Sequence, residues 1–278
     1  MTAPGAPGAL YIVSTPIGNM GDMSFRAVEV LASAALVVAE DTRHSRRLLD
    51  HYQITTRCSS YHEHNEARET PRLVKRLEEG ESIALITDAG TPLLSDPGAR
   101  LVEAAIAAGV SVVPVPGSSA LLAALVGSGL AGEHFTFLGF LPRKGKERLR
   151  ALAVIMQLEH TAVIYESPLR VAATLEELAE FGASTRTAVV ARELTKKFEE
   201  FSRGTIAELA VKFAESPPRG EVVILIGGGV RETVTEENLR AAAQGMRADG
   251  STARDIVERL TSEHGAARNL AYRLAHEE

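Results

Sequence analysis

Short apolar runs alternate with longer amphipathic runs over most of the chain. Runs of aliphatic and β-branched residues predict strands at 9–14, 36–40, 81–87, 110–115, 134–140, 160–167, 186–193 and 220–227. Apolar residues at three- and four-residue spacing predict helices at 24–35, 42–52, 64–80, 98–109, 145–158, 168–182 and 204–215. Regular alternation of strands and helices is typical of a mostly parallel sheet with helices on both faces, so the pattern predicts an α/β protein.

The alternation stops and begins again near residues 114–120, PVPGSSA. We therefore expect two α/β domains, over residues 9–116 and 117–230. Residues 196–203 leave little chain for a helical crossover, which predicts antiparallel neighbouring strands there. Residues 1–8 have neither a charged side chain nor an apolar block, which indicates a disordered tail and not a signal peptide.

The last part of the chain, residues 235–278, has no strand pattern and predicts three short helices separated by glycines. Two interpretations stay open. A compact three-helix unit often binds nucleic acid, and the alternative is a helical cap packed on the second α/β domain. Between Arg240 and Arg273 six arginines stand against four acidic residues, a bias too mild to choose between them.

Composition narrows the class of protein. The chain has 278 residues, of which 45% are hydrophobic and 24% charged, ordinary values for a globular protein. The longest apolar run, around 119–131, is too short to span a bilayer. The single cysteine, Cys58, excludes an internal disulfide, favours a reducing cytoplasm and is interpreted as a small packing residue. Because the net charge is −6, nucleic acid would have to be bound by local basic patches.

Loops rich in Gly, Pro, Ser, Thr and Asp follow four of the predicted strands. They are STPIGNMGD (14–22), AEDTRHS (39–45), TDAGTPLLSDPG (87–98) and PGSSA (116–120). Because such sheets bind ligands beyond the carboxyl ends of their strands, these loops predict a pocket for a polar organic ligand. The last loop also begins a helix whose free N–H groups suit an anion or a carboxylate.

The motifs of several common sites are absent. No G-x-G-x-x-G follows the first strand, no G-x-x-x-x-G-K-[ST] is present, and PGSSA is not the G-x-S-x-G of a hydrolase. His62 and His64 have no third ligand at metal spacing, so we interpret them as surface or hydrogen-bonding residues and expect no metal.

Nine segments resemble, in chain order, the tetrapyrrole-methylase superfamily. They are STPIGNMGD, AEDTRHSRRLL, HEHNE, LITDAGTPLLSDPG, PVPGSSA, GFLPRK, YESPLR, ARELTK and RGEVVILI. The resemblance covers about residues 9–278. Within the superfamily, the segments are most similar to the branch that methylates small-subunit ribosomal RNA. It implies two α/β domains of the tetrapyrrole-methylase type with a cofactor cleft between them, followed by a small three-helix unit. It also implies a homodimer, S-adenosylmethionine as cofactor, and methylation of the ribose 2′-oxygen of a cytidine in the decoding region.

The resemblance further implies which residues contact the cofactor. They come from the strand-end loops and from the second domain, and are Pro16, Asp88, Ala89, Gly90, Leu93, Ser118, Ser119, Tyr165 and Glu221. At Gly90 and Gly98 the lack of a Cβ would let the backbone approach the cofactor. Asp88 would accept a hydrogen bond from the cofactor or, in the alternative, from N–H groups of its own loop.

Methyl transfer to a hydroxyl needs alignment of the reacting atoms and help in removing the proton. The candidate bases are Glu40 and Asp41 at a strand end, with Asp22, His62 and Glu66 from neighbouring loops. Asp41 is equally suited to cap the helix that follows, and the motifs do not select one base.

Two basic runs are candidates for contact with RNA phosphates. TRHSRR supplies Arg43, Arg46 and Arg47, while LPRKGKERLR, with five basic residues and one acid, supplies Arg143, Lys144 and Lys146. The alternative for either run is a solvated helix face.

Two rival functions share part of this pattern. One is a methylase of the same superfamily acting on a tetrapyrrole or on a modified protein side chain, although TPIGN and LPRKGKE lack the apolar character that would cover a large flat ring. The other is a non-catalytic regulator that would bind DNA through residues 251–276 and transfer no methyl group. Met20 stands where leucine is common in the family, a tolerated exchange.

Overall fold

The computed structural model describes residues 8–130, 133–229, 236–262 and 265–277. The tail expected over residues 1–8 lies outside this part of the chain except for Gly8, whose N–H donates to the carbonyl of Leu77 at 2.7 Å. The chain divides into two compact units, residues 1–228 and 229–278. The finer domain boundaries stay a prediction.

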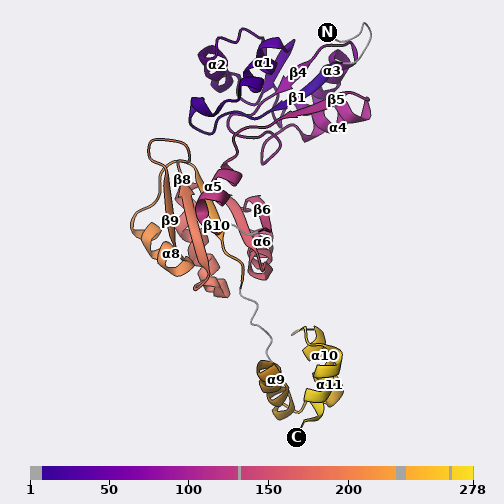
Figure 1. The fold of residues 1–278 in the computed structure, drawn as a ribbon, viewed down its shortest axis with the longest axis vertical. Helices are drawn as coiled ribbons and strands as arrows, with labels where there is room; N and C mark the ends of the chain where they lie inside the picture. The colour runs from indigo at the N-terminus through magenta and orange to yellow at the C-terminus, as the bar shows by residue number, and fades with distance from the viewer. Residues whose placement is uncertain (1–7, 131–132, 230–235, 263–264, 278) are drawn as a thin grey trace. The chain divides into compact units, whose positions relative to one another are not determined.

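The first sheet is parallel in every registered pair, as the sequence predicts (Figure 1). Its strands are β1 (Ala9–Val13), β2 (Leu36–Ala39), β3 (Cys58–Ser60), β4 (Ile83–Leu85) and β5 (Ser111–Val115), in the order β3-β2-β4-β1-β5. The connecting helices are the 3-10 turn η1 (Met20–Asp22), α1 (Phe25–Ser33), α2 (Thr42–His51), α3 (Glu66–Glu78) and α4 (Ala99–Ala107). The carboxyl ends of the strands therefore meet at one edge.

Neighbouring residues of a strand point to opposite faces of this sheet, so each strand contributes to two cores. Leu10 of β1 packs with Leu77 of α3 and Leu101 of α4. Val13 of the same strand packs on the other face with Leu31 of α1. Strands buried on both faces are the reason that the sequence shows continuous apolar runs there.

The strand β3 was not predicted. Its sequence, Cys58-Ser59-Ser60, is short and polar, and it is held only at the edge of the sheet by parallel pairing with β2. Cys58 is half-buried and packs against the core that contains Val37, which confirms its interpretation as a packing residue. Burial raises the pKa of its thiol.

The second sheet of residues 1–228 is mainly antiparallel, so the expectation of a mostly parallel sheet is wrong here. Its strands are β6 (Phe135–Phe140), β7 (Thr161–Glu166), β8 (Thr187–Arg192), β9 (Glu200–Thr205) and β10 (Val222–Ile226), in the order β6-β7-β10-β8-β9. The helices are α5 (Ala120–Ser128), α6 (Gly145–Gln157), η2 (Pro168–Arg170), α7 (Val171–Leu178), the π-helical turn η3 (Ala179–Ala183) and α8 (Ile206–Glu215).

The antiparallel character of this sheet comes from its last three strands, β8, β9 and β10. Only β6 and β7 pair in parallel, while β10 lies between β7 and β8 and is antiparallel to both. β8 and β9 are joined by residues 193–199, too few for a helical crossover, and pair antiparallel. The antiparallel pair expected near residues 196–203 is thus confirmed.

The unit of residues 229–278 contains three helices among its described residues, as predicted. They are α9 (Glu236–Ala248), α10 (Ala253–Ser262) and α11 (Arg268–His276), which share a core that includes Leu239, Ile256 and Leu274. In the described part of the chain no helix is both long and apolar enough to cross a membrane.

Candidate functional site

The segment after β4 is attached to the end of β1 through Gly90. The N–H of Thr15 donates to the carbonyl of Gly90 at 2.8 Å, and the N–H of Gly90 donates back at 3.0 Å. The Thr15 hydroxyl also donates to the carbonyl of Thr87 at 3.1 Å. Gly90 has a φ of +85°, and Leu93 and Ser95, at +76° and +70°, also adopt the left-handed region that side chains other than glycine rarely enter. The loop is therefore held in a strained shape that a turn alone does not need.

A cavity of about 490 Å³ opens beside this segment. Its walls come from loops after the strands of the first sheet and from β7, β10 and their flanking residues in the second. The lining residues are Ile17, Glu40, Asp88, Ala89, Gly90, Thr91, Leu94, Ser95, Asp96, Ser119, Ala120, Phe140, Tyr165, Glu166, Ser167, Pro168, Leu194, Gly220, Glu221, Val222 and Val223.

Most of the residues expected to contact a cofactor are brought together here. Those that line the cavity are Asp88, Ala89, Gly90, Ser119, Tyr165 and Glu221. Pro16, Leu93 and Ser118 do not line it. Pro16 is buried, Leu93 packs against the core of the first sheet, and the carbonyl of Ser118 accepts a hydrogen bond from the Thr91 hydroxyl at 3.2 Å.

A glycine is needed at position 98, but not for approach to the cofactor as expected. Its φ is +132°, and a Cβ there would lie 2.6 Å from Cδ2 of Leu85. Gly98 precedes α4 and does not line the cavity. The close approach that it permits is therefore to a buried strand residue and not to a cofactor.

Three of the five carboxylates that line the cavity come from the first sheet's loops: Glu40 follows β2, and Asp88 and Asp96 lie in the segment after β4. Burial and the nearby charges of Asp88 and Asp96 raise the pKa of Glu40. Burial and the charge of Asp88 raise the pKa of Asp96. One oxygen of Asp88 accepts a hydrogen bond from the N–H of Asp41 at 3.2 Å, so Asp88 holds the residue that precedes α2.

Sequence reasoning missed Asp96, Thr91 and Glu166 as lining residues. Asp96 belongs to the Asp-Pro-Gly at the end of the segment, a sequence that is typical of a turn. Its half-buried position beside two other carboxylates, which no local pattern shows, distinguishes it from a turn residue.

Asp41 and His62, two of the candidate bases, do not line the cavity. Asp41 is the N-cap of α2: its Oδ1 accepts from the N–H of Arg43 at 2.8 Å, and the same arginine, through its side-chain hydrogen bond, lowers the pKa of the carboxyl. The backbone N–H of His62 donates to the side chain of Asn65 at 2.9 Å, and its ring Nδ1 is buried without a hydrogen-bond partner among the described residues. The described part of the chain contains no group of three or more His, Cys, Asp and Glu residues that could hold a metal ion.

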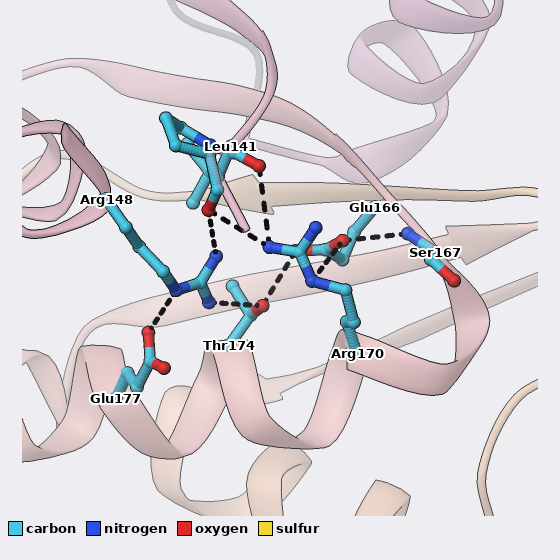
Figure 2. Close-up of polar contacts among 8 residues, drawn as sticks. Leu141, Arg148, Glu166, Ser167, Arg170, Thr174 and Glu177 are labelled. Carbon is cyan, nitrogen blue, oxygen red and sulfur yellow. Dashed lines mark hydrogen bonds and ion pairs between the residues drawn. The ribbon is translucent and has the colours of Figure 1, made fainter. Parts of the chain in front are cut away.

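The two basic runs differ in how they are exposed. Arg43, Arg46 and Arg47 are exposed on α2, where Arg43 pairs with Asp41. In the second run the exposed residues Arg143, Lys144 and Lys146 lie at the start of α6. One of the five basic residues of this run is not at the surface, because Arg148 is buried and hydrogen-bonded inside the protein (Figure 2).

Comparison with known proteins identifies the relatives of this chain. The family model for tetrapyrrole (corrin/porphyrin) methylases matches residues 9–210. A protein of Synechocystis sp. named ribosomal RNA small subunit methyltransferase I is 45% identical over 273 residues, which are 97% of this chain and 98% of that protein. A protein of the same name from Bacillus subtilis is 38% identical over 276 residues, 97% of this chain and 94% of the relative.

Solved structures share the fold. A uroporphyrin-III C-methyltransferase from Thermus thermophilus, complexed with S-adenyl homocysteine, has a TM-score of 0.58 at 19% identity and covers 79% of this chain and 97% of its own. A diphthine synthase has a TM-score of 0.60 at 14% identity, covering 79% of this chain and 90% of its own. The chain therefore belongs to the tetrapyrrole (corrin/porphyrin) methylase family and, within it, to the ribosomal RNA small subunit methyltransferases I.

Proposed function

We propose that this protein transfers the methyl group of S-adenosylmethionine to small-subunit ribosomal RNA. The observation that supports this most is the cavity at the strand ends, because the family's near-signature segment DAGTPLLSDPG supplies one of its walls. Relatives named for this activity cover nearly the whole chain.

The residues of the cavity fit such a cofactor. Its volume, about 490 Å³, lies in the range of small-molecule sites. The ring of Tyr165 packs edge-on against Phe137 and Phe140, with centroids 4.9 and 5.5 Å away, and gives the cavity an apolar wall. Glu40, Asp88 and Asp96 supply negative charge that suits a cationic ligand. When bound, S-adenosylmethionine supplies a methyl group already activated by a positively charged sulfur.

We propose Glu40 as the base that accepts the proton of the attacking hydroxyl. Of the five candidates from the sequence it is the one that lines the cavity, and its raised pKa makes its carboxylate a stronger proton acceptor than an ordinary glutamate. Asp96, whose pKa is raised for the same reason, is the second candidate. The other lining residues would hold the reacting atoms in line, which is where much of the acceleration of such a transfer arises.

We propose that the exposed basic residues of α2 and of the start of α6 contact RNA phosphates. These are Arg43, Arg46, Arg47, Arg143, Lys144 and Lys146, all exposed. In a chain with a net charge of −6 such local patches are needed to hold a polyanion.

We further propose the finer assignments that the resemblance implies. The methylated atom would be the ribose 2′-oxygen of a cytidine in the decoding region, and the protein would work in the cytoplasm as a homodimer. Leu122 and Val126 of α5, which are 50% and 77% exposed, supply apolar surface for a second copy. Light scattering in solution tests the dimer.

The experiment that tests the function is incubation of the protein with labelled S-adenosylmethionine and either small ribosomal subunits or naked ribosomal RNA. We expect label in the RNA, and a 2′-O-methylcytidine after digestion and mass spectrometry. Label on a base would overturn the 2′-O assignment, and no label in either substrate would overturn the proposed function.

A further inference from the structure

Two arginines in the second half of residues 1–228 hold the loop that carries part of the proposed RNA contact. This loop, residues 141–144, joins β6 to α6. Arg148 lies near the start of α6, and Arg170 lies at the end of η2. Figure 2 shows the Arg148 guanidinium between the loop and the residues Thr174 and Glu177, and the Arg170 guanidinium beside Glu166.

Arg148 uses each of its side-chain nitrogens. Its Nε donates to Oε2 of Glu177 at 2.7 Å, its Nη1 to the carbonyl of Pro142 at 3.1 Å, and its Nη2 to the hydroxyl of Thr174 at 3.0 Å. Its side chain is only 7% exposed. A buried guanidinium is costly unless it is fully partnered, so this arrangement fixes the position of Pro142 firmly.

Thr174 connects Arg148 to the wall of the cavity. Because its oxygen accepts from Arg148, its own proton is donated onward, to Oε2 of Glu166 at 2.7 Å. The other oxygen of Glu166 accepts from the N–H of Ser167 at 2.8 Å and pairs with Nε of Arg170 at 3.5 Å. The Glu166 side chain is 0% exposed, and the residue lines the cavity.

Arg170 holds the loop a second time. Its Nη2 donates to the carbonyls of Leu141 and Pro142, at 3.4 and 3.3 Å. The carbonyl of Pro142 thus receives hydrogen bonds from both arginines. With these carbonyls turned inward, the residues that follow, Arg143 and Lys144, are exposed.

We propose that Arg148 is a positioning residue that acts through Thr174 and Glu166 to hold loop 141–144 at a set distance from the cavity. RNA held by Arg143 and Lys144 then presents its hydroxyl to the bound cofactor. This inference rests on the proposed function for its consequence in methyl transfer, but the holding of the loop is a property of the protein alone. A misplacement of about 1 Å can lower a reaction rate by about 10²-fold, so a loosened loop should impair transfer without loss of the cavity.

The test compares Arg148→Met with a matched control, Arg186→Met. Arg186 is a half-buried residue directly before β8. It donates to two carbonyls near the C-terminal end of α6, those of Ile155 at 3.0 Å and Leu158 at 3.2 Å. It does not line the cavity. Both variants lose hydrogen bonds from a guanidinium to backbone carbonyls, but only Arg148→Met releases the loop.

Three measurements are made on the full chain: cofactor affinity by calorimetry, KM and kcat with small ribosomal subunits, and the rate of trypsin cleavage after Arg143 and Lys144. Arg148→Met should speed this cleavage and lower kcat/KM by about 10²-fold. Its cofactor affinity should stay within about threefold of wild type, because Glu166 keeps its bonds to Ser167 and Arg170. Arg186→Met should leave the cleavage rate in the loop unchanged.

Two further variants test whether the loop is held by the hydrogen bonds from Arg148 through Thr174 to Glu166, and not by the general stability of the protein. Thr174→Val removes the hydroxyl between Arg148 and Glu166 and should also speed cleavage of the loop, whereas Arg148→Lys keeps the charge without the forked donors and should restore transfer only in part. Unchanged cleavage in Arg148→Met, or equal losses of transfer in the Arg148 and Arg186 variants, would overturn the proposal. If the wild-type protein methylates no RNA, the proposed function fails, and the cleavage rates still decide whether Arg148 holds the loop.

Discussion

At the scale of single residues, the site depends on backbone conformations that most side chains avoid. Leu93 and Ser95 have positive φ values in the segment after β4, and such residues cost about 1–3 kcal/mol each. The segment keeps this shape because Gly90 is paired with Thr15 through two backbone hydrogen bonds. Ser95 lines the cavity, and strained backbone of this kind is typical of a binding site.

Gly90→Val should abolish cofactor binding. Gly90 lines the cavity, and a valine would place its methyl groups there beside Ile17, whose Cγ2 would lie 3.4 Å from the new Cβ. The positive φ should also lower the free energy of unfolding by about 1–3 kcal/mol. Calorimetry with S-adenosylmethionine and thermal unfolding measure the two effects.

The control for that change is Gly109→Val. Gly109 also has a positive φ, +72°, and a Cβ there would meet nothing within 4 Å. It should destabilise the protein by a similar amount and leave cofactor binding intact. Normal binding by the Gly90 variant would place the cofactor elsewhere.

Methyl transfer should depend on pH through the carboxylates of the cavity. Burial raises the pKa of Glu40 above its usual value, so this group binds a proton more readily as the pH falls. The protonated form cannot accept the proton of a hydroxyl, so the single-turnover rate should fall on the acid side, with a midpoint above that of an ordinary glutamate. Glu40→Gln should lower the rate by about 10²–10⁴-fold and remove this dependence.

Asp96→Asn is the matched comparison, since the pKa of Asp96 is also raised by burial. If the acid limb disappears in this variant and persists in Glu40→Gln, Asp96 is the base. A profile that is unchanged in both variants would show that neither carboxylate takes the proton.

At the scale of elements, the connection from β6 to α6 and the start of α6 carry basic residues of two kinds, one buried and the others exposed. Arg148 is buried and binds the carbonyl of Pro142, whereas Arg143, Lys144 and Lys146 are exposed. Each exposed cation near a phosphate releases counterions, so RNA binding through this element should weaken with salt.

Reversal of charge at Arg143, Lys144 and Lys146 to glutamate should weaken methyl transfer to ribosomal subunits far more than cofactor binding. Each lost phosphate contact lowers the salt slope of binding by about one unit. Transfer should collapse at physiological salt and recover in part at low salt. Methyl transfer against salt concentration, with calorimetry of the cofactor, measures both.

The same reversal at Arg68, Arg72 and Lys75, which are exposed basic residues of α3, is the control for net charge. It changes the total charge equally but should affect transfer much less. Equal effects in the two triple variants would mean that only the overall charge of the protein matters.

At the scale of the whole molecule, the helical unit has a core of its own, and its basic residues are largely used within it. Arg240 pairs with Glu236 and Glu277, and Arg273 pairs with Glu236. The excess of arginine over acidic residues in this unit is therefore only weak evidence that the unit binds RNA.

Removal of residues 229–278 should leave cofactor affinity unchanged. Every residue that lines the cavity lies before residue 228, and the two sheets have cores separate from that of the helical unit. Calorimetry on the shortened protein measures this. Loss of binding, with the remaining protein still folded by circular dichroism, would show that the helical unit supports the cavity.

The sequence by itself determined the features that follow from local pattern. Continuous apolar runs, such as the one that contains Ile83 and Leu85, predicted strands buried on both faces, and the parallel first sheet is confirmed. The cavity lies where the loops after those strands predicted it, with Asp88 and Gly90 in its wall. The sequence left Asp41 as either a helix cap or a catalytic base. The structure shows the cap, which an aspartate directly before a helix predicts.

Only the tertiary structure decided which long-range partners each residue meets. β10 was readable as a strand, but its place between β7 and β8 depends on pairing across the sheet. Arg148 looks like part of a basic surface until Thr174 and Glu177 are placed around it. Asp96 looks like a turn residue until two other carboxylates face the same cavity. Periodicity reports the environment of a side chain averaged along one element, whereas burial of a charge is set by atoms that are distant in sequence.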